Sequence, residues 1–241
     1  MNIPQDLIRE EAPQVQSMVS YWWDFMDREV SFWKTEGNAE VHSQGHCGRV
    51  LLLALKIGAA RQLRLRSMIA LCHASIFHDT RRKDNYLDVG HGDRAADYYR
   101  DFCKEHGIKY LPEVYATIKF HDRDDKLGEA YIRQEARKHS LGPDTQGADG
   151  SGSPAAWDDT EGWLEVYRDF KDADALDRLR LGPWMLDVRY LRTPEAKGMA
   201  DYAQRLVEAT IDAETLRQLY DWTRPYADKI KERAERGIAQ E

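Results

Sequence analysis

Apolar residues recur every three or four positions along almost the whole chain, which is the spacing of one face of an α-helix. Residues 15–33, 46–60 and 67–79 show this pattern most clearly. The last of these segments is apolar nearly all round, as expected of a central helix. We find no convincing alternation of polar and apolar residues of the kind that predicts a strand. The sequence therefore predicts an all-α protein.

The rest of the chain continues this pattern. Further helices are predicted over residues 92–106, 111–121, 128–139, 161–181, 195–213 and 214–235. Residues 141–160 are rich in Gly, Asp, Ser and Pro, which predicts a loop or insertion. Histidine and aspartate motifs within residues 42–181 lie on both sides of that loop and are expected to meet, so the loop is not a domain boundary. We predict one domain over residues 1–241, a helical bundle whose C-terminal helices lie within 195–235.

Composition limits the classes of function. The chain has 241 residues, 42% hydrophobic and 32% charged, with a net charge of −7. This acidic balance argues against an extended nucleic-acid surface, which is usually basic. The cysteines are too few and too scattered for a disulfide framework: Cys47, Cys72 and Cys103. Without a long apolar segment or an apparent signal peptide, we expect a soluble cytoplasmic protein without membrane contact. The oligomeric state stays open.

Four histidine and aspartate side chains interrupt segments that otherwise predict buried helix. They are His46, the adjacent pair His78-Asp79, and Asp174. An ionisable group on an apolar helix face is costly unless it has a partner. His46 continues the apolar face of its helix, and Asp174 lies four residues after Phe170 on another. Because imidazole and carboxylate groups together bind divalent cations, these side chains predict a metal site.

Neighbouring residues are weaker candidates. Asp172 lies about 200° round its helix from the apolar face and is expected to be solvated or to support the site. Asp177 lies on the same face as Asp174 and competes with it. His42, one turn before the first ligand, is a neighbour, a partner of a ligand or a helix-start residue. The other histidines fit no motif and are expected in the core or at the surface: His73, His106 and His139.

The order of these motifs resembles the HD-domain superfamily of metal-dependent phosphohydrolases, whose pattern is H…HD…D on an all-α scaffold. The matching segments are His46-x-x-Arg49-Val50, His78-Asp79, His91-Gly92-x-x-Ala95 and Ala173-Asp174-x-Leu176. The HD dipeptide alone is a weak signal, whereas the ordered set is specific and covers over half of the chain. The resemblance implies an HD-type bundle in which one divalent cation has these ligands: His46, His78, Asp79 and Asp174.

Some members of the superfamily bind a second cation, with the aspartate of the HD pair bridging the two ions. His91 and His121 stand in the order expected of its further ligands. His91, beside Gly92, is alternatively a helix cap or a substrate contact. Either histidine, if not a ligand, is a candidate acid for the leaving group. The resemblance thus implies one or two ions of Mn, Fe, Co, Ni, Zn or Mg, all of which accept His and Asp ligands to different degrees.

The activity implied by the resemblance is hydrolysis of a small phosphate ester, such as a nucleotide, with monoester and diester both open. A divalent cation lowers the pKa of bound water so that hydroxide can attack phosphorus, and Asp79 would position the attacking oxygen. Arg81, Arg82 and Lys83 follow the HD pair and are expected to contact the phosphate, although such a run is also typical of a solvated turn. Arg49 is expected to contact substrate or to orient Asp79.

Two other functions are compatible with the sequence. Some HD-domain relatives hold two irons and activate dioxygen, and this chain offers six similar ligands in order: His46, His78, Asp79, His91, His121 and Asp174. The HGxxA segment, which begins thirteen residues after His78, favours the hydrolase over this oxidoreductase. A non-catalytic module that senses a nucleotide is the other alternative. The complete set of ligands argues against it, because a sensor need not keep every ligand.

Overall fold

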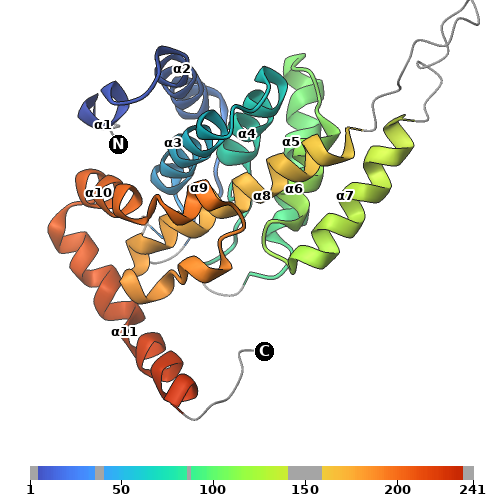
Figure 1. Ribbon diagram of the computed structural model, residues 1–241. Helices are drawn as coiled ribbons and strands as arrows, with labels where there is room; N and C mark the ends of the chain where they lie inside the picture. The colour runs from blue at the N-terminus through green and yellow to red at the C-terminus, as the bar shows by residue number, and fades with distance from the viewer. Residues whose placement is uncertain (1–4, 36–40, 86–87, 141–158, 236–241) are drawn as a thin grey trace, which may run out of the picture.

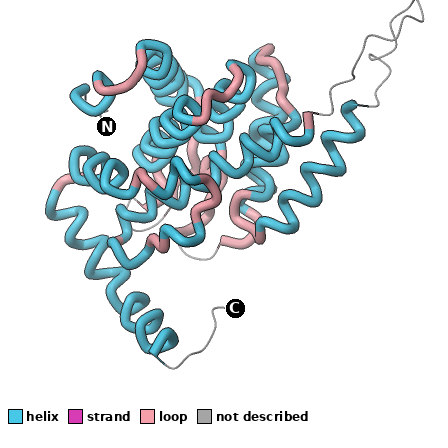
Figure 2. Tube along the Cα trace, viewed as in Figure 1, coloured by secondary structure: helices cyan, strands magenta, loops and turns pink. Residues whose placement is uncertain are grey.

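The computed structural model describes residues 5–35, 41–85, 88–140 and 159–235, and helices account for its regular structure (Figures 1 and 2). The described residues contain no strand, so the prediction of an all-α fold is confirmed. The main helices are α2 (Pro13–Glu29), α3 (Gln44–Ala60), α4 (Leu65–Phe77), α5 (His91–His106), α6 (Pro112–Phe120), α7 (Asp125–Ser140), α8 (Thr160–Leu176), α10 (Ala200–Thr210) and α11 (Ala213–Glu235). Shorter elements are α1 (Gln5–Arg9), α9 (Pro194–Lys197) and the 3-10 turns η2 (Asp177–Leu181), η3 (Pro183–Met185) and η4 (Val188–Tyr190).

The centre of the molecule is formed by α3, α4 and α8. Most side chains of α3 and α4 are buried, which explains why these segments are apolar on nearly every side. Helix α8 packs against both of them (Figure 1). Close packing of α2 on α3 depends on Gly48, because a Cβ atom there would overlap the ring of Trp23. The three cysteines are buried and free.

Three predicted helix boundaries differ from the structure for local reasons. The first helix ends at Glu29, where Val30 becomes extended, so Trp33 lies outside it and is 46% exposed. The helix predicted over 161–181 ends at Leu176 and tightens into η2. The single helix predicted over 195–213 is two, because the chain turns at Gly198. The predicted loop falls almost wholly on residues 141–158, outside the described part of the chain.

Short connections bring helix ends together on one side of the bundle. Residues 61–64 return the chain from α3 into α4, so the start of α3 lies beside the end of α4. Helices α5 and α6 are packed in the same way. The last turn of α8 reaches the same region through its contacts with α3 and α4. Residues far apart in the sequence therefore meet where these helices begin and end.

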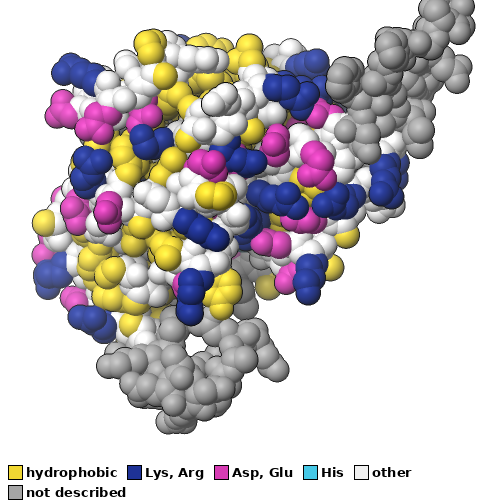
Figure 3. Space-filling model, viewed as in Figure 1, with side chains coloured by type: hydrophobic (Ala, Val, Ile, Leu, Met, Phe, Trp, Pro, Cys, Tyr) yellow, Lys and Arg dark blue, Asp and Glu magenta, His cyan; other side chains and the backbone are white. Residues whose placement is uncertain are grey.

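The surface carries charges of both signs. On the face drawn in Figure 3, lysine and arginine side chains lie among aspartates and glutamates, and neither sign gathers in one broad patch. Among the helices that the structure describes, none combines the length with the apolar character needed to cross a bilayer.

His73 makes the stability of the fold sensitive to acid. It packs against Trp22 and Tyr99 in the core, and burial lowers the pKa of its imidazole from 6.5 to about 4. The unfolded chain therefore binds a proton at a higher pH, so this stabilisation is complete above pH 6.5 and is lost as the pH falls towards 4. We expect His73 to contribute on the order of 3 kcal/mol to the loss between pH 7 and pH 4, measured by urea denaturation as the difference between the wild type and a variant without this imidazole. His73→Gln should flatten this slope, and an unchanged slope would contradict the assignment.

Candidate metal centre

Six histidine and aspartate side chains gather inside the bundle at the ends of five helices. They are the six residues proposed as ligands from the sequence: His46, His78, Asp79, His91, His121 and Asp174. Three overlapping groups have ligand atoms within 4.8 Å of one another: His42–His46–Asp79, His46–His78–Asp174 and His78–Asp79–His121. Nearly all of these side chains are buried. The structure thus brings together residues up to 128 positions apart (174 − 46).

Asp79 lies at the middle of the cluster. Its Oδ2 atom is 3.5 Å from Nε2 of His46 and 3.7 Å from Nε2 of His78. Its Oδ1 atom is 3.4 Å from Nε2 of His91 and 3.6 Å from Nε2 of His121. Oδ1 is buried and accepts no hydrogen bond from the residues described here. Oδ2 therefore faces His46 and His78, together with His42, whereas Oδ1 faces His91 and His121.

The outer ring nitrogen of each of the four histidines is held by an acceptor. The Nδ1 atoms of His78, His91 and His121 lie 2.9, 2.8 and 2.7 Å from the carbonyl oxygen three residues earlier. A carbonyl oxygen only accepts, so each of these Nδ1 atoms carries the proton and each Nε2 atom carries a lone pair. His46 has the same tautomer, because its Nδ1–H donates to the carboxylate of Asp177 at 2.7 Å.

The inner ring nitrogens face each other in pairs. The Nε2 atoms of His46 and His78 are 3.1 Å apart, and those of His91 and His121 are 2.9 Å apart. Two lone pairs at such distances repel each other unless a proton or a cation lies between them. In the interior, little water compensates for this repulsion. Four imidazole nitrogens and two carboxylates are also the donor types that divalent transition metals prefer. This buried cluster can therefore hold a metal ion.

The pKa values of Asp79 and Asp174 keep both carboxylates of the cluster ionised at neutral pH. Burial raises the pKa of Asp79, but the nearby His78 and His42 more than offset it, so this pKa lies well below its ordinary value. Burial lowers the pKa of His78 to about 3. Burial also lowers the pKa of His121, yet the nearby carboxylates of Asp79 and Asp174 more than offset this effect, so the pKa of His121 is raised. The carboxylates are thus ionised at neutral pH and favour a cation.

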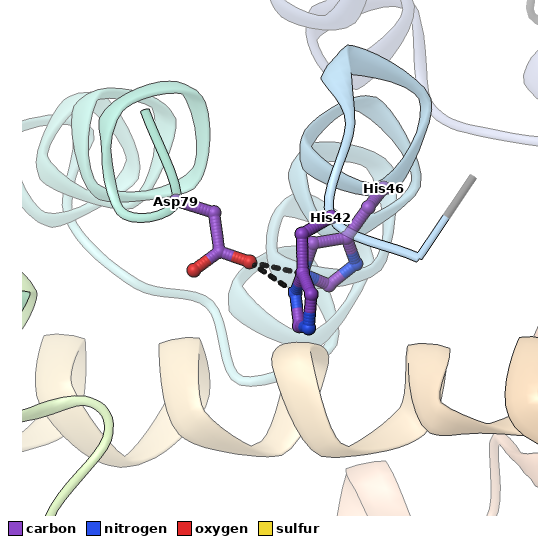
Figure 4. Close-up of side chains that lie close together, drawn as sticks. All are labelled: His42, His46 and Asp79. Atoms are coloured by element: carbon purple, nitrogen blue, oxygen red, sulfur yellow. Dashed lines mark hydrogen bonds and ion pairs between the residues drawn. The ribbon is translucent and has the colours of Figure 1, made fainter. Parts of the chain in front are cut away.

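His42 approaches the cluster from the side nearest to solvent. Its Nδ1 atom lies 2.7 Å from Oδ2 of Asp79, and Figure 4 shows His42 and His46 converging on this one oxygen. Of the roles left open by the sequence, the structure supports that of a hydrogen-bonding partner of a candidate ligand. The side chains of His42 and Asp174 are 15% and 22% exposed. The cluster reaches the surface at these two residues.

Two of the expected substrate-binding cations lie at or near the cluster. Nη1 of Arg82 is 3.1 Å from Nε2 of His91 and 3.7 Å from Oδ1 of Asp79, although the residue is only 7% exposed. Lys83 follows it with an exposed side chain, and its backbone N–H donates to Asp88. Arg82 is therefore part of the wall of the cluster, and Lys83 is solvated.

The other two expected cations, Arg81 and Arg49, have partners outside the group of ligand atoms. The guanidinium of Arg81 stacks 3.3 Å from the centre of the Tyr98 ring. Arg49 is 1% exposed, and its Nε and Nη2 donate to Asp177 at 2.7 and 3.2 Å. A buried guanidinium needs a carboxylate partner, and this one lies behind His46 rather than among the ligand atoms. The position of Arg49 is that of a structural cation, not of a substrate contact.

The three aspartates near the end of α8 have separate partners. Oδ1 of Asp174 lies 3.3 Å from Nε2 of His46. Asp172 faces away from the cluster, as the helical spacing predicts, but it is buried and not solvated, because the segment after η4 covers it. There its Oδ2 accepts hydrogen bonds from the amide and hydroxyl of Thr193 at 2.8 Å. The contact of Asp177 with His46 was not predicted. The only feature of the sequence that pointed to Asp177 was its position on the apolar face of the predicted helix.

The glycine of the HGxxA motif has a packing role. Gly92 lies in the first turn of α5, where this helix meets the end of α6. A Cβ atom there would lie 2.9 Å from the carbonyl oxygens of Ile118 and Lys119, closer than side chains tolerate. Only glycine permits this approach of the two helices, which brings His91 up to His121.

Comparison with known proteins assigns no family to this chain. No family model, no curated protein and no solved structure matches this chain. Membership of the HD-domain superfamily therefore stays a prediction from the ordered motifs. The candidate centre is defined by its geometry, which is a buried cluster of histidines and aspartates able to hold a metal ion.

Proposed function

We propose that this protein is a metal-dependent phosphohydrolase of the HD-domain type that acts on a small phosphate ester such as a nucleotide. The observation that carries the proposal is the set of four imidazoles around Asp79, each with Nδ1 held from outside and Nε2 directed inward. The motif order H…HD…H…H…D supports it. A divalent cation bound there would supply a Lewis acid and lower the pKa of bound water.

The side chains of the cluster have distinct roles in this proposal. One cation would be held by His46, His78, Asp79 and Asp174, and a second by Asp79, His91 and His121. The contacts on Nδ1 orient the imidazoles before any ion binds, which reduces the cost of ordering them. Asp79, charged at neutral pH and with one oxygen toward each histidine pair, would connect the two ends of the site.

Arg82 is the residue best placed to bind the phosphoryl group of a substrate. Its guanidinium carries a positive charge and presents several N–H donors in one plane. It lies in the wall of the cluster, 3.7 Å from Asp79. It therefore provides local positive charge on a chain whose net charge is −7. The partly exposed side chains of His42 and Asp174 mark the side from which a substrate would enter.

A screen of substrates and metals tests this function. The protein is incubated with phosphate monoesters, nucleotides and cyclic nucleotides in the presence of Mn²⁺, Fe²⁺, Co²⁺, Ni²⁺, Zn²⁺ or Mg²⁺, and hydrolysis products are measured. We expect hydrolysis with at least one metal, its loss on chelation and its return when the metal is restored. His78→Ala should be inactive, and activity retained in this variant would refute the assigned site. Oxygen consumption with Fe²⁺, without phosphate release, would instead favour the oxidoreductase.

A further inference from the structure

We propose that Asp177 is a positioning residue whose carboxylate orients His46 and makes the His46–His78–Asp174 end of the cluster the tighter of two cation sites. The inference rests on the part of the proposed function in which the cluster binds metal. It adds a residue outside the motifs that suggested the site. It also predicts that the two ends of the cluster differ in affinity.

The surroundings of Asp177 fit an anion that holds an imidazole. The residue lies in η2, immediately after α8, and is fully buried. Its Oδ2 accepts a hydrogen bond from Nδ1 of His46 at 2.7 Å. On its other side, Arg49 donates from Nε and Nη2, and Nη1 of Arg180 lies 3.3 Å from Oδ2. With guanidinium groups from two arginines around it, this carboxylate is held ionised and in one orientation.

His46 has a different partner from the other three histidines. The other three histidines donate from Nδ1 to the carbonyl oxygen three residues before them. For His46 that residue is Ser43, the N-cap of α3, whose carbonyl oxygen accepts the amide N–H of Cys47 at 3.0 Å as the helix begins. Asp177 takes the place of the carbonyl group. A carboxylate has the additional effect of making the imidazole a stronger donor to a cation.

The same network holds the segment that carries His42. Nε and Nη2 of Arg180 donate to the carbonyl oxygen of Val41 at 2.9 and 2.6 Å, and Nη1 donates to the carbonyl oxygen of Asp177. Asp177 and its arginines thus connect α3, η2 and the segment before α3. Helix α3 carries His46, the segment before it carries His42, and η2 follows directly on α8, which carries Asp174. The His91–His121 end has backbone carbonyl oxygens in the corresponding places.

The affinity of Asp177→Asn for Mn²⁺, measured by competition with a chelator, tests the inference. Asparagine keeps an oxygen that can accept from His46 but removes the negative charge. We expect the tightest Mn²⁺ site to weaken about 10- to 100-fold, which is the usual effect of losing such a partner. The weaker site should be unchanged. Equal Mn²⁺ affinity of wild type and Asp177→Asn, or weakening of the second site alone, would overturn the inference.

Asp172→Asn is the matched control for structural damage. It removes another buried carboxylate at the end of α8, one that is bound to Thr193 and faces away from the cluster. We expect it to lower the melting temperature without changing Mn²⁺ affinity. Mn²⁺ binding weakened equally in both variants would reduce the role of Asp177 to stability alone and overturn the inference.

A double variant separates folding from metal binding further. Asp177→Asn removes the charge that Arg49 faces, so Arg49→Met is added to remove the buried cation as well. We expect the double variant to recover thermal stability while its Mn²⁺ affinity stays reduced, and recovery of both would refute the positioning role. Measuring Mn²⁺ affinity also tests the role of Asp177 independently of the proposed hydrolase activity. If the wild type binds Mn²⁺ as described but hydrolyses no phosphate ester, the activity fails and the role of Asp177 stands.

Discussion

Asp79→Asn is expected to lower the rate of phosphate release at least about a thousandfold, which corresponds to about 4 kcal/mol of lost transition-state stabilisation. Asparagine has nearly the same size but lacks the charge that faces both histidine pairs. Its amide N–H group could donate to one of the inward Nε2 lone pairs. The metal-free variant should therefore fold at least as stably as the wild type. Initial rates at saturating metal and urea denaturation without metal measure the two effects.

Asp169→Asn is the control for this prediction. Asp169 is also a buried carboxylate, but it pairs with Arg61, the residue that follows α3, and lies outside the cluster. Burial raises its pKa to about 7, so the group is only partly ionised at neutral pH and a neutral amide removes less than a full charge there. We expect its rate of phosphate release to stay near that of the wild type. A rate within tenfold of wild type in Asp79→Asn would contradict the central role given to this carboxylate.

Gly92→Ala is expected to lower the free energy of unfolding and to weaken the His91–His121 end of the site. In many helices an alanine in place of glycine gains up to about 1 kcal/mol of helix propensity. Here the added methyl group would lie 2.9 Å from two backbone carbonyl oxygens of α6, which cannot rotate away as a side chain can. Overpacking of this kind costs about 1–3 kcal/mol and forces α5 away from α6. Urea denaturation and the stoichiometry of bound Mn²⁺ measure the two effects.

Gly198→Ala provides the comparison at a permissive position. Its Cβ atom would meet one carbonyl oxygen, that of Glu195, at an ordinary distance of 3.5 Å. We expect the free energy of unfolding of this variant to lie within about 0.5 kcal/mol of the wild-type value. It should also bind the same amount of Mn²⁺. If Gly92→Ala is equally harmless, the close approach of the two helices does not depend on glycine.

Helix positions and the polarity of their faces could be predicted well from the sequence because they depend on neighbouring residues. Helical periodicity marks the segments of α3 and α4 as strongly apolar, and these helices lie at the centre of the fold with α8 packed against both. The same periodicity places His46, His78 and Asp174 on apolar faces. Boundaries were less accurate where a single backbone turn ends a helix, as at Val30 and Gly198.

The partners of buried charges could not be predicted in the same way. Spacing placed Asp172 and Asp174 on opposite sides of α8, but it did not show that a later segment covers Asp172. It also left Arg49 as a candidate substrate contact, whereas this residue binds Asp177 inside the fold. Whether a surface is solvated depends on which other segment packs over it. That segment is determined by the whole arrangement of helices.

Local periodicity, set by the 3.6-residue turn, therefore determined that this chain is helical and which polar residues interrupt its apolar faces. Only the tertiary structure decided that these residues share one cluster and that each imidazole turns its Nε2 inward. The contact of His46 with Asp177 joins residues 131 positions apart. Such a contact arises from the crossing of packed helices, and no repeat within a single helix encodes it.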